Sequence, residues 1–472
     1  AGTTDEPQRV DASRIGDYVK FSENVPLEDS DAINLPLGGR EMSAITDLVP
    51  LTRLVALTAG GAYRIGGDSD VLTPSNAGTK PLNNIGSADI PATLVGTGAV
   101  YVQRDLRKIR SISYNELDGA ASSELTIFCD HLFSRGYTVV GMDYAEAPYG
   151  IIWAVRNNGD LVSITYLPEQ EVIAAAWHQT DGEVEQVCVI PEDEVDSVYV
   201  LVKREIAGNT YRYIERLTDR DPDDSRDMVC VDSALSYDGR MTGTVLLSGS
   251  SWAANDHVTA TRSSGSWTAA DIGKQIWLYG ESLVKGTITT SGSSVDLLLE
   301  TAVPASLQNV SVSNWAVAVT TLSGLQHLSG KTVSVQTDGV VHNDLLVVDG
   351  EIALSYHTAI AHVGLGFTAN IETLPLTIVN KETIRWRKKT VPKVAVLVTE
   401  SASLWAGRDA AHLDHMEGRD VSDSYAVPEP FTGLMEVAID GTWEDTGQVQ
   451  VWQQEAAPLT ILGLIPDVKV GS

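Results

Sequence analysis

The chain has 472 residues, and its 33 Lys and Arg residues stand against 63 Asp and Glu residues, which gives a formal net charge of −30. This length suggests about three domains of about 150 residues each, and the 43% hydrophobic content can form a large core. Such acidity excludes a protein that wraps nucleic acid by displacing counterions, because that requires clustered Lys and Arg. The 40 glycines and five phenylalanines favour turns over long packed helices.

Membrane insertion, metal binding and secretion have no clear signal in the sequence. Apolar runs stay far below the roughly 18 residues of a membrane-spanning helix, so we expect no such segment. Cys129, Cys188 and Cys230 show no CxxC spacing, which predicts small buried apolar residues and neither disulfides nor a zinc site. The start, Ala-Gly-Thr-Thr, lacks Met and the pattern of a signal peptide, and we interpret it as a processed or incomplete terminus.

The first part of the chain predicts an arm followed by strands. Residues 1–35 are polar and acidic, which predicts an extended N-terminal arm. From residue 36 short apolar runs alternate with Gly, Asp and Pro pairs, as in β-structure. One helix is predicted, over Ser122–Ser134, because its apolar residues recur at spacings of three and four. These residues are Leu125, Phe128, Cys129 and Leu132.

Three hairpins in series are predicted over residues 149–217. Their turns lie at Asn157–Asp160, Thr180–Gly182 and Ala207–Asn209, where Asn, Asp and Gly permit positive φ. The turns are about 25 residues apart, so two hairpins have about the length of a four-stranded propeller blade. We therefore predict a β-propeller-like core whose first part is residues 36–240, although no WD or kelch motif recurs in the sequence.

An acidic run at Asp219–Asp224 interrupts the β pattern and predicts a solvated linker. Asp219, Asp221 and Asp223 match the first three ligand positions of a calcium loop. Asp224, however, replaces the turn glycine, and Cys230 stands where the bidentate Glu belongs. A solvated acidic loop is therefore the preferred interpretation, and a nonstandard calcium site is the alternative.

The rest of the chain predicts three further all-β parts. Residues 241–320 are rich in Ser, Thr, Gly and Val and poor in charge, which predicts an inserted small β-barrel, with a small sandwich as the alternative. Residues 321–380 return to the charged, turn-punctuated pattern of the β core. Residues 381–472 alternate as strands and predict a C-terminal β-sandwich. The fold class expected is all-β throughout.

Two basic islands interrupt the acidity of the chain. We predict the second as a partner interface, because a basic stripe around a tryptophan can contact an acidic protein surface or phosphates. Its residues are Arg385, Trp386, Arg387, Lys388 and Lys389. The first island comprises Arg104, Arg107, Lys108 and Arg110. The alternative for both is outward-facing strand charges that discourage edge pairing.

Motifs for catalysis and cofactor binding are incomplete, so we expect no enzyme, cofactor or metal. Gly324–Thr332 resembles a phosphate-binding loop, but its glycines are one position too far apart. The sequence contains no GxSxG elbow. His412 and His415 could ligate a metal on a helix, yet a pair without a third ligand more often lies on a surface loop.

Several segments together resemble the tail nozzle, or tail hub, proteins of short-tailed bacteriophages. The resemblance covers roughly residues 10–470, and its motifs are specific to the family more than to one role in the tail. The segments that carry it are Tyr101–Arg104, Ala147–Arg156, Glu169–Val172, Ala176–His178, Tyr211–Leu217, Gly324–Val333, Thr337–Gly339 and Thr373–Leu376. The insert at 241–320 is similar to the small barrel named after the first catalytic-cysteine half-domain of ubiquitin-activating enzymes, in fold and not in chemistry.

This resemblance implies a structural virion protein, made in the host bacterial cytoplasm and assembled into the phage tail. It implies a homohexameric ring below the portal and adaptor, around a channel through which DNA passes unbound during genome retention and ejection. Tail fibres or spikes are further expected partners. Two alternatives stay open: a tail adhesin that binds or cleaves carbohydrate, which would need a carboxylate pair in a groove, and a monomeric ligand-binding propeller.

Overall fold

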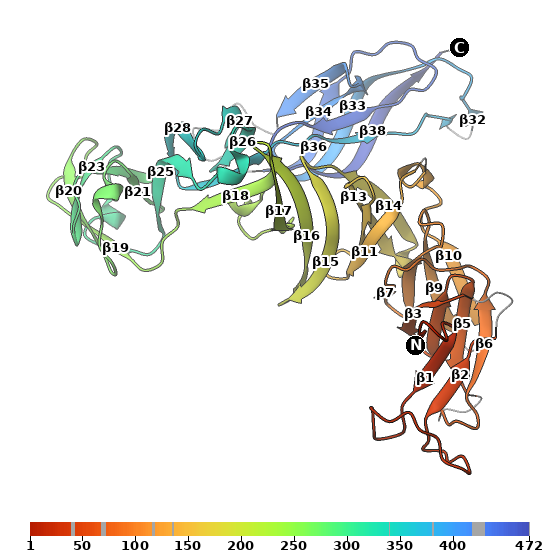
Figure 1. The fold of residues 1–472 in the computed structure, drawn as a ribbon. Helices are drawn as coiled ribbons and strands as arrows, with labels where there is room; N and C mark the ends of the chain where they lie inside the picture. The colour runs from red at the N-terminus through yellow and green to blue at the C-terminus, as the bar shows by residue number, and fades with distance from the viewer. Residues whose placement is uncertain are drawn as a thin grey trace. The chain divides into compact units, whose positions relative to one another are not determined.

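The computed structural model describes residues 1–38, 43–67, 72–115, 119–134, 136–338, 340–379, 382–417 and 430–471. Among these residues all regular structure is antiparallel β-sheet and short 3-10 turns, which confirms the predicted all-β class. The chain divides into two compact units, Ala1–Leu217 and Thr218–Ser472. Figure 1 shows the first unit in red to yellow and the second in green to blue.

The first unit contains strands β1 to β17 and two 3-10 turns. The strands are β1 (Arg9–Ala12), β2 (Ile33–Pro36), β3 (Ile45–Pro50), β4 (Leu54–Thr58), β5 (Gly61–Gly66), β6 (Gly78–Asn83), β7 (Thr93–Val95), β8 (Gly98–Val102), β9 (Ile109–Asn115), β10 (Gly119–Glu124), β11 (Val139–Ala145), β12 (Ile151–Arg156), β13 (Leu161–Leu167), β14 (Val172–His178), β15 (Glu183–Glu192), β16 (Val195–Ile206) and β17 (Asn209–Arg216). The turns are η1 (Asp130–Leu132) and η2 (Pro168–Gln170).

Sheets of sequential strands form the body of the first unit. The meanders β3–β6, β7–β10 and β11–β14 have four strands each, and β15–β17 has three. Neighbouring sheets share cores, because alternate residues of a strand face opposite sides. On β12, Ile152 and Ala154 face the β7–β10 sheet, whereas Ile151, Trp153 and Val155 face the β15–β17 sheet. Two buried faces explain why this strand is apolar at five consecutive positions.

Two of the three hairpins predicted over residues 149–217 are present, β12–β13 and β16–β17, with Gly159 at φ +85° in the turn of the first. The hairpin predicted around Thr180–Gly182 is wrong, because β14 pairs with β13 and β15 pairs with β16, so this segment connects two different sheets. The sheets have the strand number and order of propeller blades. Within the described residues, however, the blades form an open series and no closed propeller is seen.

The prediction of a helix over Ser122–Ser134 is wrong. Ser122 lies in β10 and pairs with Ile112 of β9, and the single turn η1 follows. Leu125 and Leu132 are buried between two sheets, but Phe128 is 86% exposed. The spacing of three and four thus arises from a strand end and a tight turn that fill one core, and not from one face of a helix.

The predicted N-terminal arm is held at its two ends. β1 pairs with β2, and Val10 and Leu37 pack on Tyr63 of the β3–β6 sheet. Residues 13–32 form the excursion between the two strands, with the buried Asp31 carboxylate 3.0 Å from Arg14. The arm is therefore a ribbon that covers the free face of the first sheet.

The second unit contains strands β18 to β38 and four 3-10 turns. The strands are β18 (Asp232–Asp238), β19 (Val245–Ser248), β20 (His257–Arg262), β21 (Gln275–Leu278), β22 (Val284–Ile288), β23 (Ser294–Leu299), β24 (Ser311–Val312), β25 (Trp315–Ser323), β26 (Thr332–Thr337), β27 (Val340–Leu346), β28 (Glu351–Thr358), β29 (Ile360–Leu365), β30 (Ala369–Glu372), β31 (Ile378–Val379), β32 (Glu382–Thr383), β33 (Lys389–Ser401), β34 (Ser403–Asp409), β35 (His412–Glu417), β36 (Phe431–Ala438), β37 (Gln450–Gln453) and β38 (Thr460–Val470). The turns are η3 (Ser225–Asp227), η4 (Ala269–Asp271), η5 (Ala305–Leu307) and η6 (Gln326–Leu328).

An inserted module lies between β18 and β26. Its seven strands, β19 to β25, surround a core of their own, in which the Trp267 and Trp315 ring centroids are 5.9 Å apart. β28, which follows β27 in the chain, pairs with β25 and completes an eight-stranded sheet in the order β24-β19-β20-β23-β22-β21-β25-β28. β24 and β25 lie far apart in this order although two residues join them, so the sheet must coil round its core. The pairing of the described residues does not close it into the expected barrel.

The chain returns from the inserted module to the strand that it left. β18 pairs with β29, and β26 and β27 complete this four-stranded sheet. β18 belongs to the predicted first part of the core, residues 36–240, and β29 belongs to the predicted return segment, residues 321–380. Among the described residues the strands of 321–380 pair within the second unit. A C-terminal sandwich follows, in which β36-β33-β38 and β30-β37-β34-β35 share one core through residues such as Val396 and Leu404.

Candidate functional site

The predicted partner interface is a short loop between β32 and β33. We call residues Arg385–Lys388 the basic Trp loop. The Arg387 amide donates to the Ile384 carbonyl at 3.0 Å, which closes a tight turn. Trp386 is 72% exposed, and the Arg387 guanidinium carbon lies 5.0 Å from its ring centroid. The turn thus presents a cation–π pair, which suits an acidic or aromatic partner.

Lys389 differs from the other four predicted interface residues, because its side chain is fully buried. Its ammonium donates to the carbonyls of Arg387 (3.0 Å) and Asp445 (2.5 Å). Its backbone pairs with Glu444 through two 2.7 Å hydrogen bonds. Lys389 therefore anchors the basic Trp loop and is inaccessible to a partner, which corrects the prediction for this residue.

The first basic island is partly neutralised by its own sheet. The Lys108 ammonium lies 2.9 Å from the Glu124 carboxylate, and Arg110 lies 3.5 Å from the same group. The hydrogen bond that Lys108 donates to Glu124 raises the pKa of Lys108. These cations stabilise the β9–β10 pair, whereas Arg104 and Arg107 are exposed. The basic Trp loop is the better candidate for contact with a partner.

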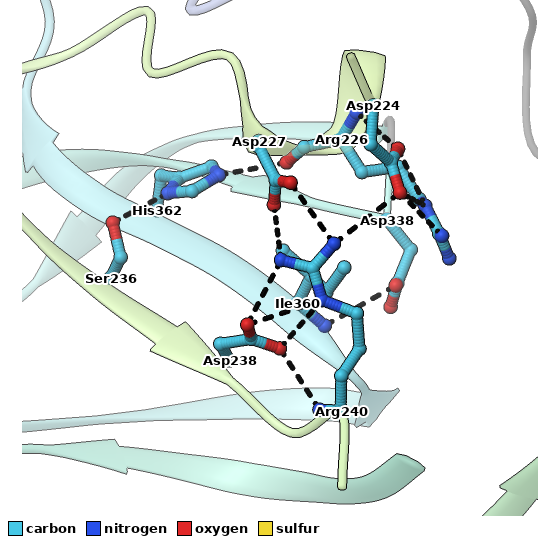
Figure 2. Close-up of polar contacts among 9 residues, drawn as sticks. All are labelled: Asp224, Arg226, Asp227, Ser236, Asp238, Arg240, Asp338, Ile360 and His362. Atoms are coloured by element: carbon cyan, nitrogen blue, oxygen red, sulfur yellow. Dashed lines mark hydrogen bonds and ion pairs between the residues drawn. The ribbon is translucent and has the colours of Figure 1, made fainter. Parts of the chain in front are cut away.

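A dense ion-pair network surrounds Arg240, which follows β18 where the chain leaves for the inserted module. Figure 2 shows its guanidinium among three carboxylates: Asp227 at 2.5 Å, Asp238 at 2.9 Å and Asp224 at 3.4 Å. Arg226 also binds Asp224 at 2.6 Å, and its guanidinium lies 5.3 Å from the Tyr279 ring of the inserted module. The network therefore connects the linker, β18 and the insert.

These contacts shift the pKa values of the carboxyl groups. Hydrogen bonds from Arg226 lower the pKa of Asp224 below its ordinary 3.8. Burial acts to raise the pKa of Asp238, but hydrogen bonds from Arg240 outweigh it and lower this pKa as well. Because both folded-state pKa values are depressed, the network stabilises the fold above about pH 4 and loses this contribution as the pH falls further.

Removal of Arg240 tests whether the network holds the linker. We expect Arg240→Ala to lower the free energy of unfolding of this region by about 1–2 kcal/mol, because three partly exposed carboxylates lose charged hydrogen bonds. Residues 218–231 should then be cleaved several-fold faster by thermolysin. Arg212→Ala is the matched control, since Arg212 forms an equally close pair with Glu185 on β15. Equal cleavage of both variants would show that the network does not hold the linker.

A serine–histidine pair lies beside this network. Ser236 Oγ is 2.6 Å from His362 Nδ1, and His362 Nε2 donates to the Arg226 carbonyl at 2.8 Å (Figure 2). A nucleophilic serine needs a base oriented in this way, but here a backbone carbonyl stands in the place of the usual carboxylate. Ser236 and His362 are also direct cross-strand neighbours on β18 and β29. Through the hydrogen bond from His362 to the Arg226 carbonyl, the pair holds the linker against the sheet of β18 and β29.

The two predicted metal alternatives find no support among the described residues, which contain no cluster of three or more potential ligands. In the acidic run, Asp224 caps η3 and binds two arginines instead of a cation. His412 and His415 lie on β35, so their odd spacing places them on opposite faces. His412 binds Asp409 at 2.7 Å, and His415 stacks on Trp405 with centroids 4.2 Å apart.

Comparison with known protein families and curated proteins finds no match for the chain: no family model matches, and no curated protein is significantly similar to it. In the described part of the chain no helix is long and apolar enough to cross a bilayer.

Proposed function

We propose that this chain is a structural, non-enzymatic protein of a short-tailed phage tail. Built as a nozzle or hub, it forms a ring of about six copies below the portal and adaptor. The observation that carries the proposal is the architecture: serial antiparallel meanders, a seven-stranded module inserted after β18 and a C-terminal sandwich. The sequence patterns predict the same order of modules, and the resemblance to tail nozzle proteins implies the ring.

The charge of the chain is suited to DNA that passes without being held. A lumen that bound phosphates through Lys and Arg would slow the DNA during ejection, because each such contact releases counterions from the DNA and thereby strengthens binding. A net charge of −30 is compatible with a lumen that repels phosphate. Genome retention and ejection from the virion, after synthesis in the host cytoplasm, are the roles that we propose for such a ring.

Contacts between copies need local attraction, because identical acidic proteins repel one another. The basic Trp loop is suited to this, since it presents Trp386 and Arg387 to an acidic surface. On the N-terminal excursion, Tyr18 and Val19 are 87% and 84% exposed. A closed ring uses two different patches of each copy, head to tail. These two surfaces, the adaptor and tail fibres or spikes are the contacts that we propose.

The native mass of the purified chain tests the proposal. Light scattering at low micromolar concentration should give about six copies, and negative-stain images down the particle axis should show a central hole. Charge reversal at Arg385 and Arg387 should weaken the ring, and the same change at Arg104 and Arg107 is the control. A monomer at every concentration, also with adaptor present, contradicts the ring, and a compact trimer favours the carbohydrate-binding adhesin.

A further inference from the structure

Strand β14 is an unprotected sheet edge. It forms the outer edge of the β11–β14 sheet, and among the described residues it pairs with β13 alone. All seven of its residues are exposed, with Val172 at 39%, Ile173 at 38% and Trp177 at 50%. Its sequence, Val-Ile-Ala-Ala-Ala-Trp-His, contains no carboxylate, lysine, arginine or proline. Apolar side chains therefore face solvent on both sides of an open backbone edge.

Other edges of the first unit are protected in the usual way. Edge strands are normally guarded against pairing by charged residues, proline or bulges. Every other described edge strand of six residues or more in the meanders carries such a residue. Examples are Asp47 on β3, Lys80 and Pro81 on β6, Glu124 on β10, Asp143 on β11, Glu185 on β15 and Arg212 on β17. The absence of protection is thus specific to β14.

We propose that β14 binds an extended segment of a different protein by edge-to-edge strand pairing. The outward backbone N–H and C=O groups of an edge strand can form hydrogen bonds with a further strand. The partner segment must therefore have an extended backbone. The apolar side chains on both faces specify small or β-branched apolar residues in the partner. This inference does not depend on the ring or on the virion role.

The charges around β14 indicate which charged residues the partner strand carries. Glu169 and Glu171 are exposed directly before the strand, and Asp181 follows it. Two cations near β14 are buried and paired: Arg156, 5.7 Å from the Trp177 ring, pairs with Asp160, and Arg204, which donates to the Asp181 carbonyl at 2.7 Å, pairs with Glu215. The partner strand therefore carries basic residues beside its apolar centre, because opposite charges across an interface select partners.

A second copy of this chain is a poor occupant of the β14 edge. Each copy carries a net charge of −30, and antiparallel self-pairing of β14 would bring Glu169 of one copy towards Asp181 of the other. Like charges across strands are destabilising. A basic-ended strand from another component is consistent with both the charge and the open edge.

Binding of defined peptides to the full chain tests the inference. The probe is a fluorescent synthetic peptide of alternating valine and threonine with lysines at both ends, and its counterpart has glutamates at both ends. We expect anisotropy to report binding of the lysine-ended peptide and an affinity at least about tenfold weaker for the glutamate-ended one. Binding of neither peptide, or equal binding of both, would overturn the inference.

Three variants localise the binding to β14. Ala174→Lys places a charge in the middle of the edge and should weaken binding of the lysine-ended peptide at least about tenfold. Ala174→Thr introduces an uncharged residue that favours strands, so this variant should still bind the peptide. Glu169→Lys together with Glu171→Lys should reverse the preference and favour the glutamate-ended peptide. All three positions are exposed, so unchanged thermal unfolding serves as the folding control. Binding that persists unchanged in Ala174→Lys would place the peptide elsewhere and contradict the proposal.

Discussion

Gly407→Ala should destabilise the C-terminal sandwich by about 3 kcal/mol. Gly407 lies on β34 opposite Leu413 of β35, beside a register shift. A Cβ atom at this position would lie 1.8 Å from the His412 carbonyl oxygen and 2.8 Å from the carbonyl carbon. Backbone atoms cannot swing aside as a flexible side chain does, so the β34–β35 pair must separate locally. Denaturant unfolding, followed by hydrogen exchange of β33–β36, measures the loss.

Gly463→Ala is the matched control for this variant. Gly463 lies on β38 in the same sandwich, and nothing lies within 4 Å of a Cβ built on it. Since alanine restricts the unfolded chain more than glycine does, this change should be neutral or stabilising by about 0.5 kcal/mol. Equal stability of the two variants would mean that β34 and β35 are not as close as the structure places them.

Local signals in the sequence were sufficient to predict two of the three hairpins, whereas the turn residues at Thr180–Gly182 connect two sheets and form no hairpin. The turns at Asn157–Asp160 and Ala207–Asn209 contain residues that tolerate positive φ, and Gly159 and Gly208 adopt φ values of +85° and +79°. The apolar runs on either side then predict strands. The stacking of successive sheets was not predictable in the same way, because it depends on which sheet covers each face of strands such as β12.

The predicted helix shows where a local pattern fails. Leu125 and Leu132 fit a helical spacing, but Phe128 would have had to face the same core. In the structure Phe128 is exposed, and the neighbouring buried residues reach the core from a strand end and a turn. Spacing in a short segment cannot distinguish these cases, since both place apolar residues three or four positions apart.

The candidate sites were predictable only in part, for a related reason. The run of basic residues identified the exposed Arg385–Lys388 turn, but Lys389 points inward because β33 begins there. The Arg240 network joins carboxylates that come together only when the linker folds back on β18. The uncharged sequence of β14 was visible from the start, whereas its position at an open edge required the sheet order.

Lys389→Ala should lower the free energy of unfolding of the C-terminal sandwich by about 3 kcal/mol and loosen the basic Trp loop. The side chain is fully buried, and its removal leaves the carbonyls of Arg387 and Asp445 without their donor. Each carbonyl loses a hydrogen bond from a charged donor, a bond worth about 1.5–3 kcal/mol, and the cavity left by the shortened side chain adds to this cost. Denaturant unfolding measures the stability, and hydrogen exchange of residues 384–389 measures the order of the loop.

Two further variants separate the causes of this loss. Lys389→Met keeps most of the volume and removes the donor, so it should retain the packing but still speed amide exchange in the loop. Lys388→Ala removes an exposed ion pair with Asp445, 2.9 Å long, and should change the stability by less than about 0.5 kcal/mol. If Lys389→Ala is no worse than Lys388→Ala, the buried ammonium does not anchor the loop. A stable fold with faster exchange confined to residues 384–389 would instead show that Lys389 orders the surface that presents Trp386.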